Sequence, residues 1–187
     1  MNLVLDDIRF SRGAYTLTAD AVFSPGVHII SGRTGTGKST LALATAGLLA
    51  PDAGEIRYWD RCGAPLLLMQ FPEYQVTGTT VTEEIDSWKV AGTEEPFALF
   101  KVTPSDRDPL TISSGELRRL ELACILARTA ELLILDEPYA SLDRTAKPVL
   151  TKLLEERSGI TLVFSHETEF NPAAQHWKIS DGGLRHE

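Results

Sequence analysis

The chain has 187 residues, of which 43% are hydrophobic and 24% are charged. This composition fits one globular domain and argues against a disordered or low-complexity chain. With 26 acidic against 18 basic side chains, the net charge of −8 disfavours contact with phosphate backbones, so we expect no nucleic-acid partner.

Membrane and disulfide signals are weak. The longest nearly uninterrupted apolar stretch, residues 41–50, is about half the length needed to cross a bilayer, and the amino terminus lacks a basic flank before an apolar core. We therefore expect no direct membrane insertion. Cys62 and Cys124 have no CxxC spacing, which favours free thiols in a reducing cytoplasm over a disulfide framework or a zinc site.

The first third of the chain contains strand, glycine-loop and helix signals in that order. Residues 3–10 and 15–23 alternate in polarity and predict antiparallel strands. Residues 27–30 form a short apolar run that predicts a buried strand. After the glycines, residues 39–50 are rich in Ala and Leu and predict a helix, closed by a proline and a glycine.

The middle of the chain changes in texture. Residues 55–59 and 65–70 predict two further strands, the second continuously apolar as buried parallel strands are. Four prolines divide residues 71–110 into segments of mixed polarity, within which 81–90 is the best helical candidate. We expect this segment to be a short helical insert.

The last third predicts alternating helices and strands: a helix over 114–128, a strand over 132–135, a helix over 146–157 and a strand over 160–164. Such alternation favours right-handed crossovers. We expect one α/β domain over residues 1–187, with a mainly parallel sheet, helices on both faces, and an antiparallel β-subdomain at the amino terminus.

A phosphate-binding loop follows the strand over 27–30. The pattern GxxxxGK[ST] is matched by Gly32, Arg33, Thr34, Gly35, Thr36, Gly37, Lys38 and Ser39, with Thr40 next in the helix. Glycines let backbone N–H groups close around phosphates, and the helix dipole adds positive potential. The motif predicts that Lys38 reaches the β- and γ-phosphates and that Ser39 offers its hydroxyl to Mg²⁺.

A second chemical element is the apolar strand over 132–135, which is followed directly by two carboxylates. Open α/β sheets bind ligands at the carboxyl ends of their strands. Asp136 is suited to hold a metal through water, and Glu137 is suited to polarise an attacking water. Because strands often end in solvated acids, this pair alone is weak evidence for a site. It becomes strong evidence because a phosphate loop precedes it in the chain.

The stretch "TISSGELRRLELACILA", residues 111–127, combines small polar residues with a helical apolar pattern. Ser113 or Ser114 is a good N-cap, and Glu116 favours the positive end of the helix dipole. A helix N-terminus is also a natural anion site, yet this one is some seventy residues from the phosphate loop.

This arrangement resembles the ATP-binding-cassette (ABC) ATPases along nearly the whole chain. Residues 112–116 stand where that family carries its LSGGQ-type signature. In the family two cassettes face each other head to tail, and each signature helix points at the nucleotide of the other. The resemblance implies ATP and Mg²⁺ as ligands and a second ABC ATPase subunit, identical or paralogous, as partner. It assigns Ser113, Ser114, Gly115 and Glu116 to the partner's nucleotide.

Other landmarks of the family fall in the same order. Gln70 stands at the Q-loop position, where family members contact the metal and the attacking water. Asp143 belongs to Ser141-Leu142-Asp143, which matches the D-loop that crosses the dimer interface, although Ser141 or Asp143 also suits a plain helix N-cap. His166 matches the switch histidine that touches the γ-phosphate.

Residues 70–85, "QFPEYQVTGTTVTEEI", resemble more narrowly the energy-coupling-factor branch, which powers vitamin and transition-metal uptake. This resemblance implies integral membrane transporter subunits as partners and a cytoplasmic location, peripheral on the membrane through those subunits. The alternative function is a soluble ABC-class ATP switch that acts on a protein partner without transport.

Some positions depart from the family pattern. Ser114 replaces the first glycine of the usual signature pair, and Glu116 replaces glutamine. Tyr15 is the best candidate for stacking on adenine, with Arg12 as the alternative. Since the chain ends at "DGGLRHE", we expect a compact dimer without an additional carboxyl-terminal domain.

Overall fold

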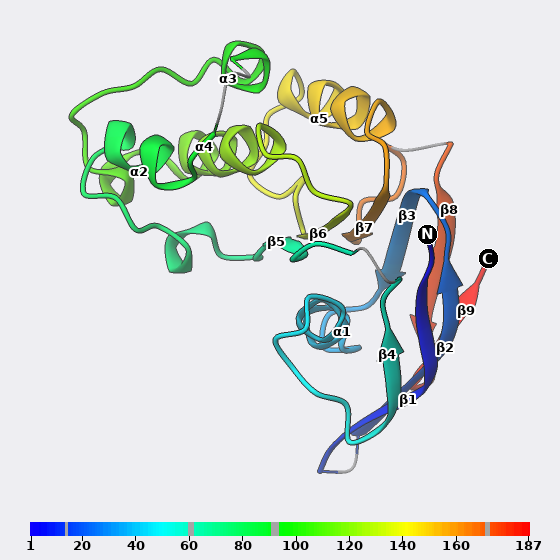
Figure 1. Ribbon diagram of the computed structural model, residues 1–187. Coiled ribbons are helices and arrows are strands. Elements are labelled where there is room, and N and C mark those ends of the chain that lie inside the picture. Colours follow the sequence, from blue (N-terminus) through cyan, green and yellow to red (C-terminus); the bar gives the residue numbers. More distant parts are fainter. Residues whose placement is uncertain (14, 60–61, 91–93, 171–172) are drawn as a thin grey trace.

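In the computed structural model of this protein, residues 1–13, 15–59, 62–90, 94–170 and 173–187 are described. Over these ranges the strands form a nine-stranded sheet in the order β4-β1-β2-β9-β8-β3-β7-β6-β5 (Figure 1). The predicted α/β class is confirmed, with a strongly curled sheet and helices on both of its faces.

The parallel half of the sheet contains β3 (Gly26–Gly32), β5 (Leu66–Leu68), β6 (Leu132–Asp136) and β7 (Ile160–Phe164). Strand β7 pairs in parallel with β3 and β6, and β6 pairs in parallel with β5. Every residue of β6 and β7 is buried, because helices cover both faces here. The phosphate loop after β3 and the two carboxylates at the end of β6 therefore lie at the same edge of the sheet, with β7 between the two strands.

The antiparallel half begins at the amino terminus, as predicted. Strand β1 (Leu3–Arg12) pairs antiparallel with β2 (Tyr15–Phe23) and with β4 (Ala53–Arg57). Strands β8 (Gln175–Ser180) and β9 (Gly183–His186) form a hairpin that joins this half to β3. In Figure 1 these strands curl away from the green helices, on the far side of β3.

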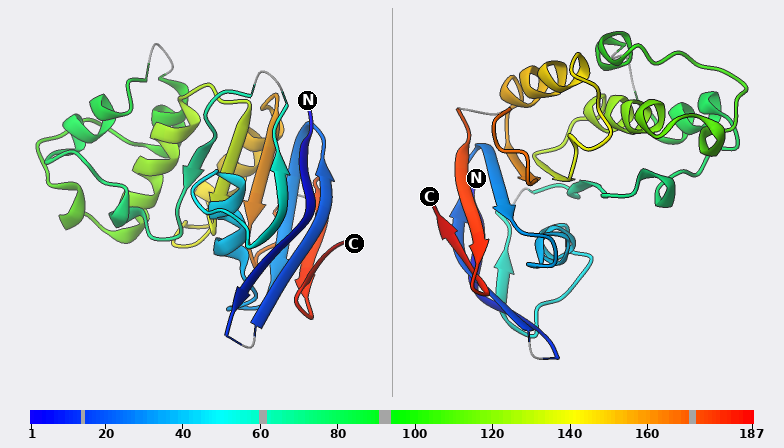
Figure 2. Two further views of the ribbon diagram at one scale, coloured as in Figure 1. Left: turned by 60° about the horizontal axis from the view of Figure 1, so that its bottom comes forward. Right: turned by 180° about the vertical axis from the view of Figure 1, so that it is seen from behind.

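Helices cover the two faces of the parallel strands separately. Helix α1 (Lys38–Thr45) packs with Leu132 and Ile134 of β6, and the opposite face packs on α4 (Ser114–Leu126) and α5 (Ala146–Glu155). Figure 2 shows α1 and the pair α4 and α5 on opposite sides of the strands. Alternation of side chains along β6 thus builds two separate cores.

The expected insert, residues 71–110, includes residues 91–93, which lie outside the described ranges. Its described elements are η1 (Pro72–Tyr74), α2 (Val81–Ser87), α3 (Glu95–Phe100) and η2 (Pro109–Thr111). They pack mainly on α4, through Val81 of α2 and Phe100 of α3.

Several expected boundaries are wrong. Helix α1 ends at Thr45 rather than residue 50, because Gly47 takes a left-handed φ of 76° that turns the chain. Helix α2 ends at Ser87 rather than residue 90, and β4 lies two residues earlier than expected. Helix α3 and the hairpin of β8 and β9 were not predicted.

No helix in the described ranges is long and apolar enough to span a bilayer. The longest of them, α4, has 13 residues, against about 20 for a spanning helix.

Candidate functional site

The phosphate loop joins the carboxyl end of β3 to the first turn of α1. Gly35 and Gly37 adopt left-handed φ values of 82° and 94°. A Cβ at Gly37 would lie 2.8 Å from Cδ2 of Leu17, so both the backbone conformation and the close approach require glycine there. The glycine spacing of the motif thus has a direct steric cause.

A cleft of about 250 Å³ opens above this loop. Its lining residues come from the loop, from the segment after β5 and from the end of β6: Thr34, Gly35, Gly37, Lys38, Ser39, Thr40, Gln70, Asp136 and Glu137. All nine are residues that the sequence singled out. Gly32, Arg33 and Thr36 belong to the same loop but do not line the cleft.

Lys38 is held inside the cleft by two oxygens. Its Nζ donates to the carbonyl of Gly32 at 2.9 Å and lies 3.4 Å from Oε1 of Glu137. The side chains of Lys38 and Glu137 are 10% and 8% exposed. A buried cation of this kind needs a partner, and in this structure the partner is the carboxylate expected to act as the base.

Asp136 ends β6 on the floor of the cleft and is 4% exposed. Burial raises the pKa of its carboxyl, opposed by a hydrogen bond from the Ser39 side chain. Among the described residues, its Oδ1 has no hydrogen-bond partner. A buried carboxylate oxygen without a partner, beside a serine hydroxyl, matches the oxygen ligands that Mg²⁺ prefers, so these residues fit the metal.

Glu137 follows directly, at a left-handed φ of 49° that is uncommon for a residue with a side chain. Its Oε2 accepts from Nδ1 of His166 at 2.9 Å and from Oγ of Ser165 at 3.3 Å. Its backbone N–H donates to the carbonyl of Phe164 at 2.8 Å. The end of β7 thereby holds the Glu137 carboxylate and brings His166 against it.

Gln70 lines the cleft from the segment that follows β5. The backbone of this segment is held by two side chains to which no role was assigned from the sequence. The guanidinium of Arg118 donates to the carbonyls of Met69 and Gln70, and the amide of Gln75 bonds both Met69 N–H and the carbonyl of Leu67. An arginine inside an amphipathic helix looks like a solvent-facing residue, so no sequence signal pointed to Arg118.

Tyr15, the residue proposed to stack on adenine, lies at the start of β2. Its hydroxyl donates to the carbonyl of Thr36 in the phosphate loop at 2.5 Å, and the side chain is exposed. The alternative, Arg12, lies 3.6 Å from Asp52 and bonds the carbonyl of Ser11. Of the two, Tyr15 is the one in contact with the loop.

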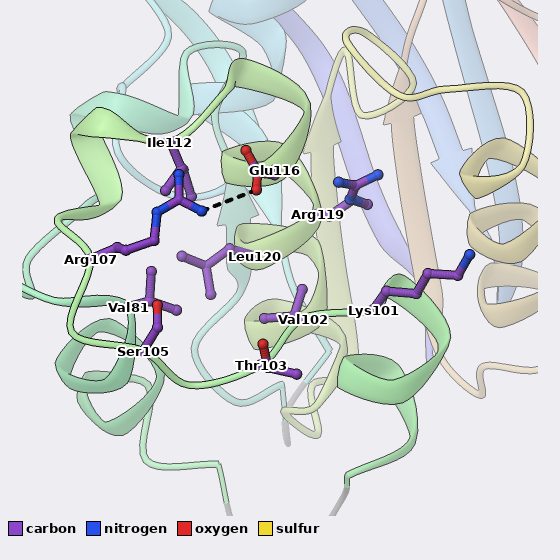
Figure 3. A pocket seen from close by; sticks show the side chains of 10 residues that line it. All are labelled: Val81, Lys101, Val102, Thr103, Ser105, Arg107, Ile112, Glu116, Arg119 and Leu120. Atoms are coloured by element: carbon purple, nitrogen blue, oxygen red, sulfur yellow. Dashed lines mark hydrogen bonds and ion pairs between the residues drawn. The ribbon is translucent and has the colours of Figure 1, made fainter.

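The signature stretch caps α4. Ser113 is the N-cap, and it exchanges hydrogen bonds with Glu116 in a capping box. The second carboxylate oxygen of Glu116 pairs with Arg107 at 3.3 Å, beside a separate cavity of about 230 Å³ (Figure 3). None of Ser113, Ser114, Gly115 and Glu116 lines the cleft of the phosphate loop.

Asp143 lies near the same end of α4. Its Oδ1 accepts from the hydroxyl of Thr145 and from the N–H of Ala146, and these bonds lower the pKa of Asp143 to about 2. Its Oδ2 pairs with Arg119 of α4 at 3.1 Å. The structure therefore brings the signature helix and the Asp143 loop together, apart from the cleft that holds Lys38.

Comparison with known proteins gives a consistent picture. The family profile described as "ABC transporter" matches residues 22–140, more than half of the chain. The chain is 33% identical over 195 residues to the energy-coupling factor transporter ATP-binding protein EcfA1 of Thermotoga maritima, with 91% of this chain and 74% of the relative covered. It is 30% identical over 201 residues to EcfA2 of Streptococcus pneumoniae, with 87% and 71% covered.

Among solved structures, a dimeric bacterial ABC transporter cassette superposes with a TM-score of 0.78, covering 99% of this chain and 97% of its own. Because its sequence identity is 19%, this likeness supports the fold alone. The profile and the two relatives carry the assignment further: the chain belongs to the ABC transporter family of ATPases.

Proposed function

We propose that this chain is the ATP-hydrolysing subunit of an energy-coupling-factor type transporter, and that it works as a dimer of cassettes on the cytoplasmic face of the membrane. The observation that carries the proposal is that Lys38, Asp136 and Glu137 line the same cleft at the glycine loop. ATP hydrolysis needs a loop that binds the phosphates, a carboxylate that holds the metal and a second carboxylate that activates the attacking water.

Binding of ATP starts from the loop. The backbone N–H groups of residues 34–39 and the amino end of α1 attract the triphosphate, and Lys38 supplies a positive charge at the β- and γ-phosphates. Tyr15 would stack on the adenine, a role that its exposure and its bond to the loop support. These contacts position the substrate before any bond breaks.

Ser39, Asp136 and Gln70 are the residues that would hold Mg²⁺. The metal supplies positive charge to the phosphate oxygens when it is bound. Asp136 suits this role because its Oδ1 has no partner in the described part of the chain. A cation there would also offset the cost of burying the carboxylate.

Glu137 acts as the general base that takes a proton from the attacking water. His166 holds the Glu137 carboxylate from one side at 2.9 Å, and the nearby end of β7 holds its backbone. The remaining oxygen of Glu137 pairs with Lys38 until the phosphates draw that lysine away. Positioning and charge stabilisation therefore account for most of the expected rate enhancement.

The signature residues complete the site of the second subunit. Ser113, Ser114 and Gly115 form the amino end of α4, which is an anion-binding terminus away from the cleft of its own chain. A partner cassette placed head to tail would bring that terminus to its γ-phosphate. Asp143, bonded to α4 through Arg119, would move with it.

Coupling to a membrane subunit is assigned to residues 71–110, the helical insert that follows Gln70. The identity to EcfA1 and EcfA2, two energy-coupling factor transporter ATP-binding proteins, supports the energy-coupling-factor branch. Closure of the dimer would then move the insert against integral membrane subunits.

Complementation between two inactive variants tests the shared site. Lys38→Ala removes the phosphate contact, and Ser114→Arg places a bulky side chain at the exposed first residue of α4 without touching the N-cap. If each nucleotide lies between two chains, a mixed dimer contains one site with intact parts from both. We expect each variant alone to be inactive and the mixture to regain ATPase activity.

Two outcomes would contradict the proposal. A mixture as inactive as its components would mean that each chain completes its own site. Wild-type ATPase activity per molecule that does not rise with protein concentration would refute dimer-dependent hydrolysis. Purification with an integral membrane protein that accelerates hydrolysis would support transport, whereas a soluble partner recovered without any membrane protein would support the ATP switch.

A further inference from the structure

Arg118 is the fifth residue of α4 and is 2% exposed, although arginine is rarely buried to this extent without partners. Its Nη1 donates to the carbonyl of Met69 at 3.0 Å, and its Nη2 donates to the carbonyl of Gln70. A planar guanidinium can hold two neighbouring oxygens at once, which fixes their direction as well as their distance.

The surroundings keep this guanidinium charged. Burial lowers the pKa of Arg118, but the nearby carboxylates of Asp136, Glu73 and Glu137 oppose that effect. Arginine does not lose its proton in proteins, so the buried charge is permanent. The charge is directed at the carbonyls of Met69 and Gln70 beside the cleft. It lies near Asp136 at the end of β6 and near the buried Glu121 of α4.

The segment that carries Gln70 has few other constraints. Strand β5 ends at Leu68, and only β6 pairs with it among the described strands. On the other edge of β5, Gln75 Oε1 accepts from the N–H of Met69 at 2.6 Å. Its Nε2 donates to the carbonyl of Leu67 at 2.9 Å. From α4, only Arg118 bonds the backbone of Met69 and Gln70. These two side chains hold the backbone from which the Gln70 side chain enters the cleft.

We propose that Arg118 is a positioning residue for Gln70, and that its two carbonyl contacts link the partner-facing signature of α4 to the cleft of the same chain. The inference rests on the proposed function. Ser113 and Arg118 stand on one helix, less than two turns apart, so a shift of the signature end moves the guanidinium as well. Through Gln70, docking of the second cassette would then be felt in the cleft of the first.

A double-mutant cycle separates positioning from general support of the fold. Arg118→Lys keeps the charge but loses the two-oxygen fork, and Gln70→Ala removes the side chain that is positioned. We expect Arg118→Lys to lower kcat by about tenfold in the wild-type background and by less than about twofold in the Gln70→Ala background. ATP affinity should change by less than about twofold, while the Mg²⁺ concentration for half-maximal activity rises.

Arg128→Met is the matched control. Arg128 also donates from the α4 region to a backbone carbonyl, that of Trp88 at 3.2 Å, but it has no contact with Gln70. This variant should keep the wild-type kcat and Mg²⁺ dependence, and thermal unfolding of all variants shows that assays are made on folded protein.

Equal losses of kcat in both backgrounds would overturn the inference, as would an unchanged kcat or an Arg118→Lys chain that does not fold. Each of these results leaves the proposed function standing if the wild type hydrolyses ATP. A wild-type protein without ATPase activity, alone or with its membrane subunits, would instead refute the proposed function.

Discussion

Lys38 and Glu137 form a buried ion pair, with 3.4 Å between Nζ and Oε1. The expected phosphate contact and the expected base therefore neutralise each other before the nucleotide arrives. By the proposed function, incoming phosphates would compete with the carboxylate for the lysine, and their binding would release one oxygen of Glu137. Substrate binding and the freeing of the base would thus be linked by one contact.

Glu137→Gln should slow ATP turnover without weakening ATP binding. Loss of a general base lowers kcat by about 10²- to 10⁴-fold. Loss of a carboxylate that holds Lys38 should leave ATP affinity equal to that of the wild type or raise it by roughly two- to fivefold. Nucleotide titration and steady-state ATPase assays measure the two effects. Weaker ATP binding in this variant would show that Glu137 helps to hold the nucleotide.

Asp136→Asn should abolish the stabilisation by Mg²⁺ without lowering the stability of the protein alone. Burial raises the pKa of Asp136, so the folded state carries the ionised carboxylate at a cost at neutral pH. Without nucleotide, the amide variant should melt at the wild-type temperature or above it. With ATP, the additional thermal stabilisation that Mg²⁺ gives the wild type should be lost. A variant that Mg²⁺ with ATP stabilises as much as the wild type would contradict the assignment of Asp136 to the metal.

Ser113→Ala removes an N-cap and, by the proposed function, a contact to the partner's nucleotide. Loss of the cap should cost about 1 kcal/mol of stability, measured by urea unfolding. Thr80→Ala is a fitting control, because Thr80 caps α2 by accepting from Glu83 N–H at 3.1 Å and has no assigned role with ATP. Both variants should lose similar stability, but only Ser113→Ala should lose ATPase activity. Equal activity losses would reduce Ser113 to a structural cap.

The sequence predicted the parts of the site that depend on local chemistry. A glycine loop between a strand and a helix has few alternative conformations, so the positions of Lys38 and Ser39 followed from the motif. The run over 132–135 could be recognised as a strand because both of its faces are buried. The contact between Glu137 and His166 was not predicted, because the family resemblance gave each residue a separate role and only the fold brings the two side chains together.

Other parts were missed for physical reasons. The hairpin of β8 and β9 had a readable signal in Asp181-Gly182, both with positive φ, but its strands have only six and four residues, so few alternating positions were available. Arg118 had no such signal, because its burial depends on hydrogen bonds to backbone carbonyls of a distant segment, which the local sequence does not reveal. Helix α3 has six residues, fewer than two turns, which is too short for a helical period to be visible.

Glu121 makes the protein's stability depend on pH. Its side chain is fully buried in α4, and neither carboxylate oxygen has a hydrogen-bond partner among the described residues. Burial, and then the charge of Glu84, raise the pKa of Glu121 to about 8, with Arg118 opposing them. The folded state therefore keeps a proton that an unfolded glutamate releases above a pH of about 4.3.

The sign of the effect follows from the proton count. Between about pH 4.3 and the folded pKa of about 8, the folded state binds more protons than the unfolded state, so stability falls as pH rises, by at most about 1.4 kcal/mol per pH unit. Glu121→Gln removes this titration. The difference in unfolding free energy between variant and wild type should shift in favour of the variant from pH 5 to pH 8 and level off above pH 8.

Urea unfolding from pH 5 to above pH 8 measures this difference. Glu155→Gln, at an exposed position of α5, is the control, and its unfolding free energy should change with pH in parallel with that of the wild type. If Glu121→Gln also ran parallel, the wild-type carboxyl would have to be ionised in the fold across this range, with a partner that compensates its charge.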